Sequence, residues 1–263
     1  AVAARRMVGR TGEEVAVSAW RERVEIAGGR AVLYLGDNRE VWPALGVRPD
    51  ALISDPPYGQ RYRNVDHLRR GRTSSLTGNA PMGRFAGAAM IGDEAAPHAD
   101  WIDAADTVLL WGAHRAAHLL PPGTWLVWDK RDGSPSNDHG DGEAAWMRAA
   151  RPGPMRIFRY LWNGTCRAPG LETARQPGSS AIVPRDHPTQ KPVALMEWCL
   201  DQAKVAAGAL VADPFAGSGS TGVACMRRGC RFIGIEIDDG YFRTACRRIG
   251  EAARQPDLLI PET

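Results

Sequence analysis

The sequence predicts an α/β fold in which buried strands alternate with helices. Short apolar runs such as ALIS (51–54) and ALVAD (209–213) stop abruptly at turn residues, as strands buried on both faces do. From residue 209 the chain reads strand, glycine turn, helix, strand and helix, which is the order of a β-α-β-α unit. With 263 residues, the chain is long enough for one such domain carrying a smaller insertion.

The first strands of this domain are expected from residue 24 onward. Residues 1–23 contain several arginines but little apolar periodicity, which favours a loosely held arm, with a DNA-contacting arm as the alternative. VEIA and RAVLYLGD predict two strands joined at Gly28 and Gly29, where a tight turn needs positive φ. VWPAL (41–45) allows a short helix before the strand ALIS.

The middle of the chain alternates apolar strands with polar loops. TVLLWG (107–112), TWLVWDK (124–130) and RIFRYLW (156–162) predict three further strands. Closely spaced arginines followed by small residues make 60–97 a loop, and glycine, serine, proline and asparagine do the same for 132–141.

The C-terminal part predicts two strands and three helices. HPTQKP places Pro192 in the first turn of a helix that ends at Gly208. The strand ALVAD, a helix through about residue 228, the strand RFIGIE (231–236) and a helix through about residue 252 follow.

Composition limits the class of protein only loosely. The net charge of +3 is too small to indicate a polyanionic partner. The five cysteines form no C-x-x-C pair or zinc-type spacing, so we expect a reduced protein without a structural metal. No apolar run approaches a membrane span of roughly 20 residues, and no signal-peptide pattern is present, so we expect a cytoplasmic protein.

The segment DPFAGSGSTG (213–222) carries the strongest ligand-binding signal. Gly217, Gly219 and Gly222 have G-x-G-x-x-G spacing between a strand and a helix, where backbone amides approach a ligand closely. Glu236 ends the next strand, where a carboxylate can accept hydrogen bonds from both ribose hydroxyls. A phosphate-binding Walker loop is excluded because Val223, not lysine, follows the last glycine.

Asp213 distinguishes between two ribose-containing ligands. An acidic residue at the end of this strand would repel the pyrophosphate of a dinucleotide, but it could accept a hydrogen bond from the ammonium of a methionine moiety. The turn therefore favours S-adenosylmethionine.

A second motif, DPPY (55–58), follows the strand ALIS. The side chain of Asp55 and the carbonyl of Pro56 are neighbouring acceptors for an exocyclic amino group, and Pro56 and Pro57 fix the backbone that holds them. Tyr58 is expected to stack on a base rotated out of the duplex. In isolation, DPPY is equally compatible with an ordinary turn after a strand.

Together these motifs resemble the β-class of DNA amino-methyltransferases, in which DPPY precedes the target-recognition region and the F-x-G-x-G motif comes last. The matching text is LYLGDN, DPPYG, HPTQKP, DPFAGSGSTG and IGIEID. The resemblance implies a Rossmann-like class I methyltransferase sheet with circularly permuted motif order and inserted recognition loops. It divides the chain into an arm (1–23), a catalytic half (24–130) with a mobile loop (60–97), a target-recognition region with an edge strand (131–188), a cofactor-binding half (189–252) and a tail (253–263).

The resemblance also implies roles for individual residues toward S-adenosylmethionine. The methionine end would contact Asp213, Phe215, Gly217, Ser218 and Gly219, and Glu236 would hold the ribose. Asp37 would face the adenine amino group with the Asn38 backbone nearby, and Thr189 and Lys191 would lie near the methionine carboxylate. His187 in the same motif is interpreted as a structural residue.

The predicted substrate is double-stranded DNA, methylated on adenine N6. Cytosine N4 is the alternative, followed by an RNA or protein-amide methyltransferase and by a DNA-binding module without activity. An arginine cluster after DPPY would contact phosphates, although an exposed loop whose arginines aid solubility explains it as well. Its members are Arg61, Arg63, Arg69, Arg70 and Arg72. A homodimer and a restriction endonuclease partner are further expectations from the resemblance.

Overall fold

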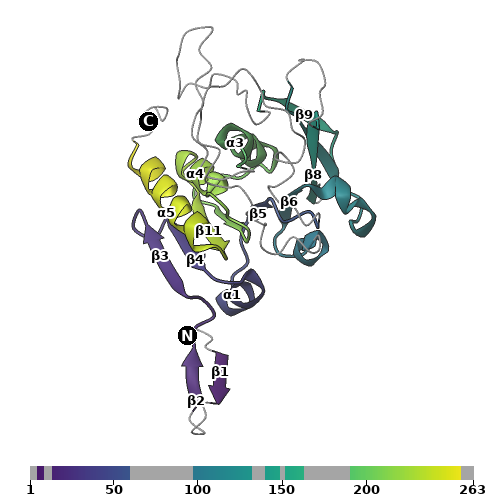
Figure 1. The fold of residues 1–263 in the computed structure, drawn as a ribbon. Helices are drawn as coiled ribbons and strands as arrows, with labels where there is room; N and C mark the ends of the chain where they lie inside the picture. Colours follow the sequence, from purple (N-terminus) through teal and green to yellow (C-terminus); the bar gives the residue numbers. More distant parts are fainter. Residues whose placement is uncertain are drawn as a thin grey trace, which may run out of the picture.

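A nine-stranded sheet forms the centre of the molecule (Figure 1). The computed structural model describes residues 5–8, 14–59, 97–131, 140–148, 152–162 and 190–255, with side chains from residue 18 onward. The strands follow the order β3-β4-β11-β10-β5-β6-β8-β7-β9. They are β3 (Glu22–Ile26), β4 (Ala31–Leu35), β5 (Ala51–Ser54), β6 (Thr107–Trp111), β7 (Thr124–Asp129), β8 (Gly142–Arg148), β9 (Arg156–Arg159), β10 (Leu210–Asp213) and β11 (Arg231–Glu236).

Most of the sheet is parallel. Only β3 and β8 run antiparallel to their neighbours, β3 at one edge and β8 between β6 and β7. The strands β10 and β5 pair in parallel at the centre, through Val211↔Ala51 and Ala212↔Leu52. Ligands of open α/β sheets bind beyond the carboxyl ends of such central strands, where the connections diverge to opposite sides.

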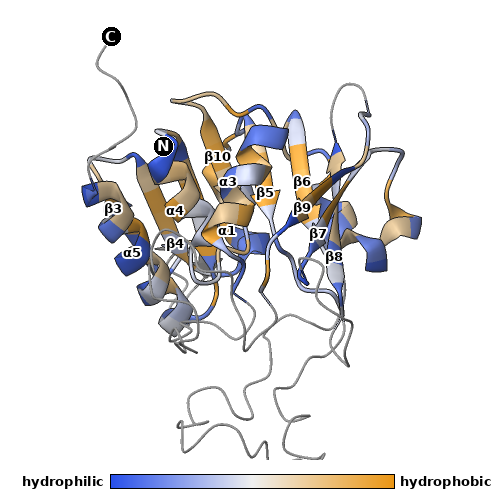
Figure 2. Cartoon of the chain, turned by 90° about the horizontal axis from the view of Figure 1, so that it is seen from above, coloured by the Kyte–Doolittle hydropathy of each residue, from blue (hydrophilic) through white to orange (hydrophobic). Residues whose placement is uncertain are grey.

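Side chains that alternate along the strands build a layer on each face of the sheet. Leu33, Ile53 and Leu109 pack in the core that α3, α4 and α5 cover, whereas Leu52 and Leu110 face the opposite layer. Short 3-10 segments and α1 cover that second face. The helices are α1 (Asn38–Leu45), α3 (Val193–Gln202), α4 (Ser220–Arg227) and α5 (Asp239–Arg254), and the 3-10 segments are η1 (Pro97–Trp101), η2 (Ala113–Arg115) and η3 (Ala117–Leu119). Figure 2 shows apolar strands between helices with hydrophilic outer residues.

The predicted strands are confirmed, with one omission inside the sheet. GEAAWMR (142–148) was not expected to be a strand, yet it forms β8 and pairs with β6 and β7 along most of its length. The segment 131–188 therefore contributes an inner strand as well as the edge strand β9. The helix after Pro192 ends at Gln202, six residues before the expected glycine stop at Gly208.

The predicted N-terminal arm contains regular structure that the sequence pattern did not indicate. Two short strands, β1 (Arg5–Val8) and β2 (Glu14–Val17), pair antiparallel as a separate two-stranded sheet (Figure 1). The main sheet then begins at Glu22, two residues before the expected start.

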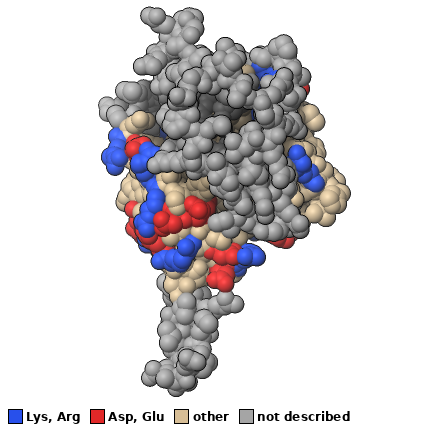
Figure 3. Space-filling model, viewed as in Figure 1, with Lys and Arg blue, Asp and Glu red and all other residues tan. Residues whose placement is uncertain are grey.

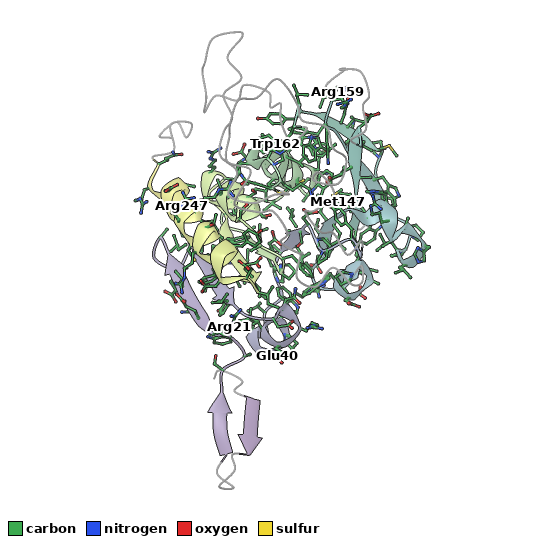
Figure 4. The ribbon with its side chains drawn as sticks, viewed as in Figure 1. Arg21, Glu40, Met147, Arg159, Trp162 and Arg247 are labelled. Carbon is green, nitrogen blue, oxygen red and sulfur yellow. The ribbon has the colours of Figure 1, made fainter. Side chains whose placement is uncertain are left out.

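The described surface carries both signs of charge. In Figure 3, basic and acidic side chains alternate on the visible part of the body, in keeping with the small net charge. Arg247 points outward from α5 (Figure 4) and pairs with Glu251 one turn later, at 3.1 Å.

Among the described helices, none is long and apolar enough to cross a membrane.

Candidate active site

The two sequence motifs meet at the carboxyl ends of β5 and β10. Because these strands are paired, the last residue of β5, Ser54, lies beside the last residue of β10, Asp213. The Ser54 hydroxyl donates a hydrogen bond of 2.5 Å to Asp213 Oδ1. DPPY and the glycine turn, separated by more than 150 residues in the chain, therefore form one continuous edge.

The glycine turn is held by the carboxylate of Glu236 at the end of β11 and by Arg248 of α5. Gly217 and Gly219 have φ of +53° and +80°, in the left-handed region that glycine enters without strain. The amide of Gly217 donates to Glu236 Oε2 at 2.8 Å, and the amide of Asp238 donates to Oε1 at 2.8 Å. Arg248 of α5 donates to the carbonyl of Ser218 at 2.5 Å and to its hydroxyl at 2.9 Å.

Glu236 lies at the end of β11, where the sequence predicted a ribose acceptor. Its side chain is half-buried, and burial raises its pKa to about 7. A carboxylate offers about four lone-pair sites, and the described amides of Gly217 and Asp238 use two of them. Glu236 therefore retains capacity for further donors.

The carboxylate of Asp213 accepts hydrogen bonds from other groups of the protein. It is 3% exposed and accepts hydrogen bonds from Ser54, from the Thr221 hydroxyl at 2.7 Å and from the amide of Phe215 at 3.0 Å. Burial raises its pKa to about 6, with these donors opposing the shift. Its carboxylate fixes the turn with three of its about four lone-pair sites, and contact with a ligand ammonium stays a prediction.

Three further residues predicted for the cofactor, Asp37, Asn38 and Phe215, lie near the same edge. Asp37 caps α1 by accepting from the amide of Arg39 at 2.9 Å, and the Arg39 guanidinium lowers the pKa of Asp37. The side chain of Asn38 donates to the carbonyl of Pro214 at 2.9 Å, which ties α1 to the glycine turn. The Phe215 ring packs edge-on against Trp101.

Asp55 is surrounded by donors. Its Oδ1 accepts from the Tyr58 hydroxyl at 2.5 Å, and its Oδ2 accepts from Lys191 Nζ at 2.5 Å. Pro56 and Pro57 between them are buried. The ring of Tyr58 lies so close to Gly112 that a Cβ at this glycine would come within 1.9 Å of a ring carbon.

Lys191 links this cluster to α4, the helix that follows the glycine turn. The backbone carbonyl of Lys191 accepts from the Ser220 hydroxyl at 2.8 Å, and the indole of Trp162 donates to the neighbouring Gln190 carbonyl at 3.1 Å. Trp162 lies beside α3 in Figure 4. Burial opposes a charged lysine here, but the carboxylates of Asp55 and Glu143 raise the pKa of Lys191 above its usual value.

The sequence analysis missed two charged residues of this cluster. Glu143, on β8, lies 3.1 Å from Lys191 Nζ and also accepts from Lys130 Nζ. Burial alone would raise the pKa of Glu143, but the ammonium groups of Lys191 and Lys130 lower it to about 2. Lys130 could have been found, because it ends the predicted strand TWLVWDK, where site residues are expected. Glu143 could not, because its segment was not expected to be a strand.

Some predicted site residues lie outside the described residues. They are Thr189, His187 and the arginine cluster Arg61, Arg63, Arg69, Arg70 and Arg72.

The fold is a Rossmann-like α/β sheet of the class I methyltransferase type. The PvuII DNA methyltransferase (cytosine-N4-specific) has the same fold, with a TM-score of 0.52 over 87% of this chain and 89% of that chain, at 12% identity. Residues 124–247 match the family N6_N4_Mtase, described as DNA methylase, which confirms the resemblance drawn from the motifs.

Curated relatives match shorter segments. The DNA adenine methyltransferase YhdJ of Escherichia coli (strain K12) is 44% identical over 68 residues, which are 26% of this chain and 23% of that protein. The type II methyltransferase M2.DpnII of Streptococcus pneumoniae is 46% identical over 63 residues, which are 24% of this chain and 23% of that protein. The matches thus span about a quarter of the length of these two relatives.

Proposed function

We propose that the protein transfers a methyl group from S-adenosylmethionine to an exocyclic amino nitrogen of a base in double-stranded DNA. The observation that supports this most directly is the junction of the two motifs, where Ser54 and Asp213 join the DPPY turn to the glycine turn at 2.5 Å. An acceptor group for an amino substrate thereby lies next to a turn suited to a nucleoside cofactor.

The glycine turn fits the methionine end of this cofactor, and Glu236 fits its ribose. Positive φ at Gly217 and Gly219 shapes a turn at the N-terminus of α4, and Glu236 keeps acceptor capacity for ribose hydroxyls. When bound, the cofactor supplies an electrophilic methyl group on a sulfonium. We also propose that S-adenosylmethionine contacts Asp37, Asn38, Phe215 and the other residues predicted for it.

The DPPY turn fits the acceptor. The lone pair of an exocyclic amino group is delocalised into the base, so the nitrogen must be made more tetrahedral before it attacks. Asp55 accepts one described hydrogen bond on each oxygen and has lone pairs left for an N–H of the substrate. The carbonyl of Pro56 would take the second N–H, and Tyr58 would stack on the base.

Adenine N6 is the proposed acceptor, because Asp in the first position of the motif resembles adenine enzymes. Cytosine N4 is the alternative, and an RNA or a protein amide is a third, less favoured substrate. Incubation with tritium-labelled cofactor and synthetic duplex DNA, followed by nucleoside analysis, tests these choices. N6-methyladenine is the expected product; N4-methylcytosine alone would overturn the choice of base, and labelling of only RNA or protein would overturn the DNA assignment.

We further propose that the arginine cluster after DPPY contacts DNA phosphates. Replacing Arg69, Arg70 and Arg72 by alanine should weaken DNA binding for all sequences and flatten the dependence of log affinity on log salt by about one unit per lost phosphate contact. Affinity measured by fluorescence anisotropy at several salt concentrations checks this. An unchanged slope would assign the cluster to solubility.

The proposal also covers the location, the oligomeric state and a partner of the protein. A cytoplasmic location follows from a DNA substrate in a bacterial or phage system, which the resemblance implies. A homodimer and a restriction endonuclease partner are proposed on the same basis, and light scattering of the purified protein measures the first of them.

A further inference from the structure

Glu143 belongs to neither motif, yet it lies in the same charged cluster as Asp55. It comes from β8, the antiparallel strand between β6 and β7, and its side chain is 18% exposed. Its Oε2 lies 3.1 Å from Lys191 Nζ, and its Oε1 accepts from Lys130 Nζ. A carboxylate so placed cannot contact Asp55 favourably, so it acts on Asp55 chiefly through the lysine between them. The Tyr58 hydroxyl, 3.3 Å from Glu143 Oε2 and 2.5 Å from Asp55 Oδ1, is a second and longer bridge.

Lys191 is held by three partners. Its ammonium lies 2.5 Å from Asp55 Oδ2, 3.1 Å from Glu143 Oε2 and 3.1 Å from the Tyr58 hydroxyl. An ammonium group has three protons to donate, and its side chain is 8% exposed. These three acceptors therefore match the donors of the lysine and fix its position.

The charges of the cluster balance. Lys130 and Lys191 contribute two positive charges, while Asp55 and Glu143 contribute two negative charges. Without Glu143, Lys130 would lose its carboxylate partner and Asp55 would be the one carboxylate left beside Lys191 among the described residues of the cluster.

This balance matters for the proposed reaction. The lone pair of the amino nitrogen forms the bond to the methyl carbon while the carbon–sulfur bond breaks and leaves its electron pair on sulfur. The nitrogen becomes cationic and then loses a proton to water. A negative Asp55 stabilises that developing charge, whereas an excess of ammonium groups nearby opposes it.

We propose that Glu143 is a positioning residue for this methyl transfer. It holds Lys191 between two carboxylates and offsets its charge, so that Asp55 keeps both its orientation and its negative field toward the amino group. This inference rests on the proposed function, and it adds a strand outside both motifs to the machinery.

The first test separates turnover from binding. Glu143→Gln should lower kcat for methyl transfer by about 10- to 100-fold, because the acceptor geometry and charge are disturbed, while KM for S-adenosylmethionine stays within about twofold. Glu143→Asp, which keeps the charge, should restore part of kcat. Glu197→Gln is the matched control, because it removes the carboxylate of a half-buried ion pair with Arg227 outside the cluster and should leave kcat unchanged.

The second test asks whether Glu143 acts through Lys191. In a Lys191→Met background, adding Glu143→Gln should change kcat by much less than it does in the natural chain, since the lysine to be positioned is absent. Equal effects in both backgrounds would overturn the inference. Should Glu143→Gln fail to fold, judged by thermal unfolding, Glu143→Asp in both backgrounds gives the same comparison.

The outcomes distinguish this inference from the function on which it rests. A natural chain that transfers no label to DNA contradicts the proposed function. A natural chain that methylates DNA, with an unchanged kcat in Glu143→Gln, contradicts only the role of Glu143.

Discussion

Asp55 and Asp213 stand at the carboxyl ends of neighbouring strands, but the protein treats their carboxylates differently. Asp55 keeps 25% of its side chain exposed and pairs with the ammonium of Lys191, whereas Asp213 is 3% exposed and its side-chain partners are hydroxyls. Burial raises the pKa of Asp213 to about 6, with its hydroxyl and amide donors opposing the shift. The comparison teaches that the carboxylate of Asp55, directly after β5, is accessible for chemistry, whereas the carboxylate of Asp213, at the end of β10, builds the turn.

Removing Asp55 should give the largest effect. Asp55→Ala should lower methyl transfer by about 10²–10³-fold or more, because it removes the acceptor proposed for the reacting amino group, while cofactor binding changes little. Filter-binding of labelled product, with calorimetry for the cofactor, measures both. Full activity in this variant would show that the acceptor lies elsewhere, and loss of cofactor binding would assign Asp55 to the same structural role as Asp213.

Removing Asp213 should chiefly affect stability. Asp213→Ala leaves the hydroxyls of Ser54 and Thr221 buried without their acceptor, which should lower the free energy of unfolding by about 1–3 kcal/mol. Asp213→Asn keeps one carbonyl acceptor and should cost less. Urea unfolding measures the difference; if Asp213→Ala kept full stability but lost cofactor affinity, Asp213 would be a binding residue and the contrast with Asp55 would disappear.

A pH titration should give the smallest effect, at Glu236. Its pKa of about 7 means that the ionised fraction of the free protein grows as pH rises through neutrality. Ribose hydroxyls donate best to the ionised form, so cofactor affinity should increase with pH, by at most about tenfold per unit, until Glu236 is fully ionised. Calorimetry between pH 6 and 8 checks this, and Glu236→Gln should bind with a flat profile. A pH dependence that survives in Glu236→Gln would have to come from another group.

The sequence predicted those parts of the site that follow a recognisable strand. DPPY and the glycine turn each come after a compact apolar run, and parallel pairing brings such strand ends together. Glu143 could not be found this way, because GEAAWMR has small residues where alternation would be diagnostic, and its strand forms through pairing on both sides. The partners of the Lys191 ammonium come from two distant segments, DPPY and β8, so its ion pair with Asp55 was also beyond a local pattern.

The pairing of β5 with β10 also determines which changes in chain length the site tolerates. Residues inserted between the two motifs leave Val211 opposite Ala51, so they need not alter the distance between the DPPY turn and the glycine turn. A slip of one residue in this register would shift one turn against the other by roughly 3.3 Å and turn Ser54 to the opposite face of the sheet. The spacing between the two turns is therefore measured across the sheet, in steps of a single residue, rather than along the chain.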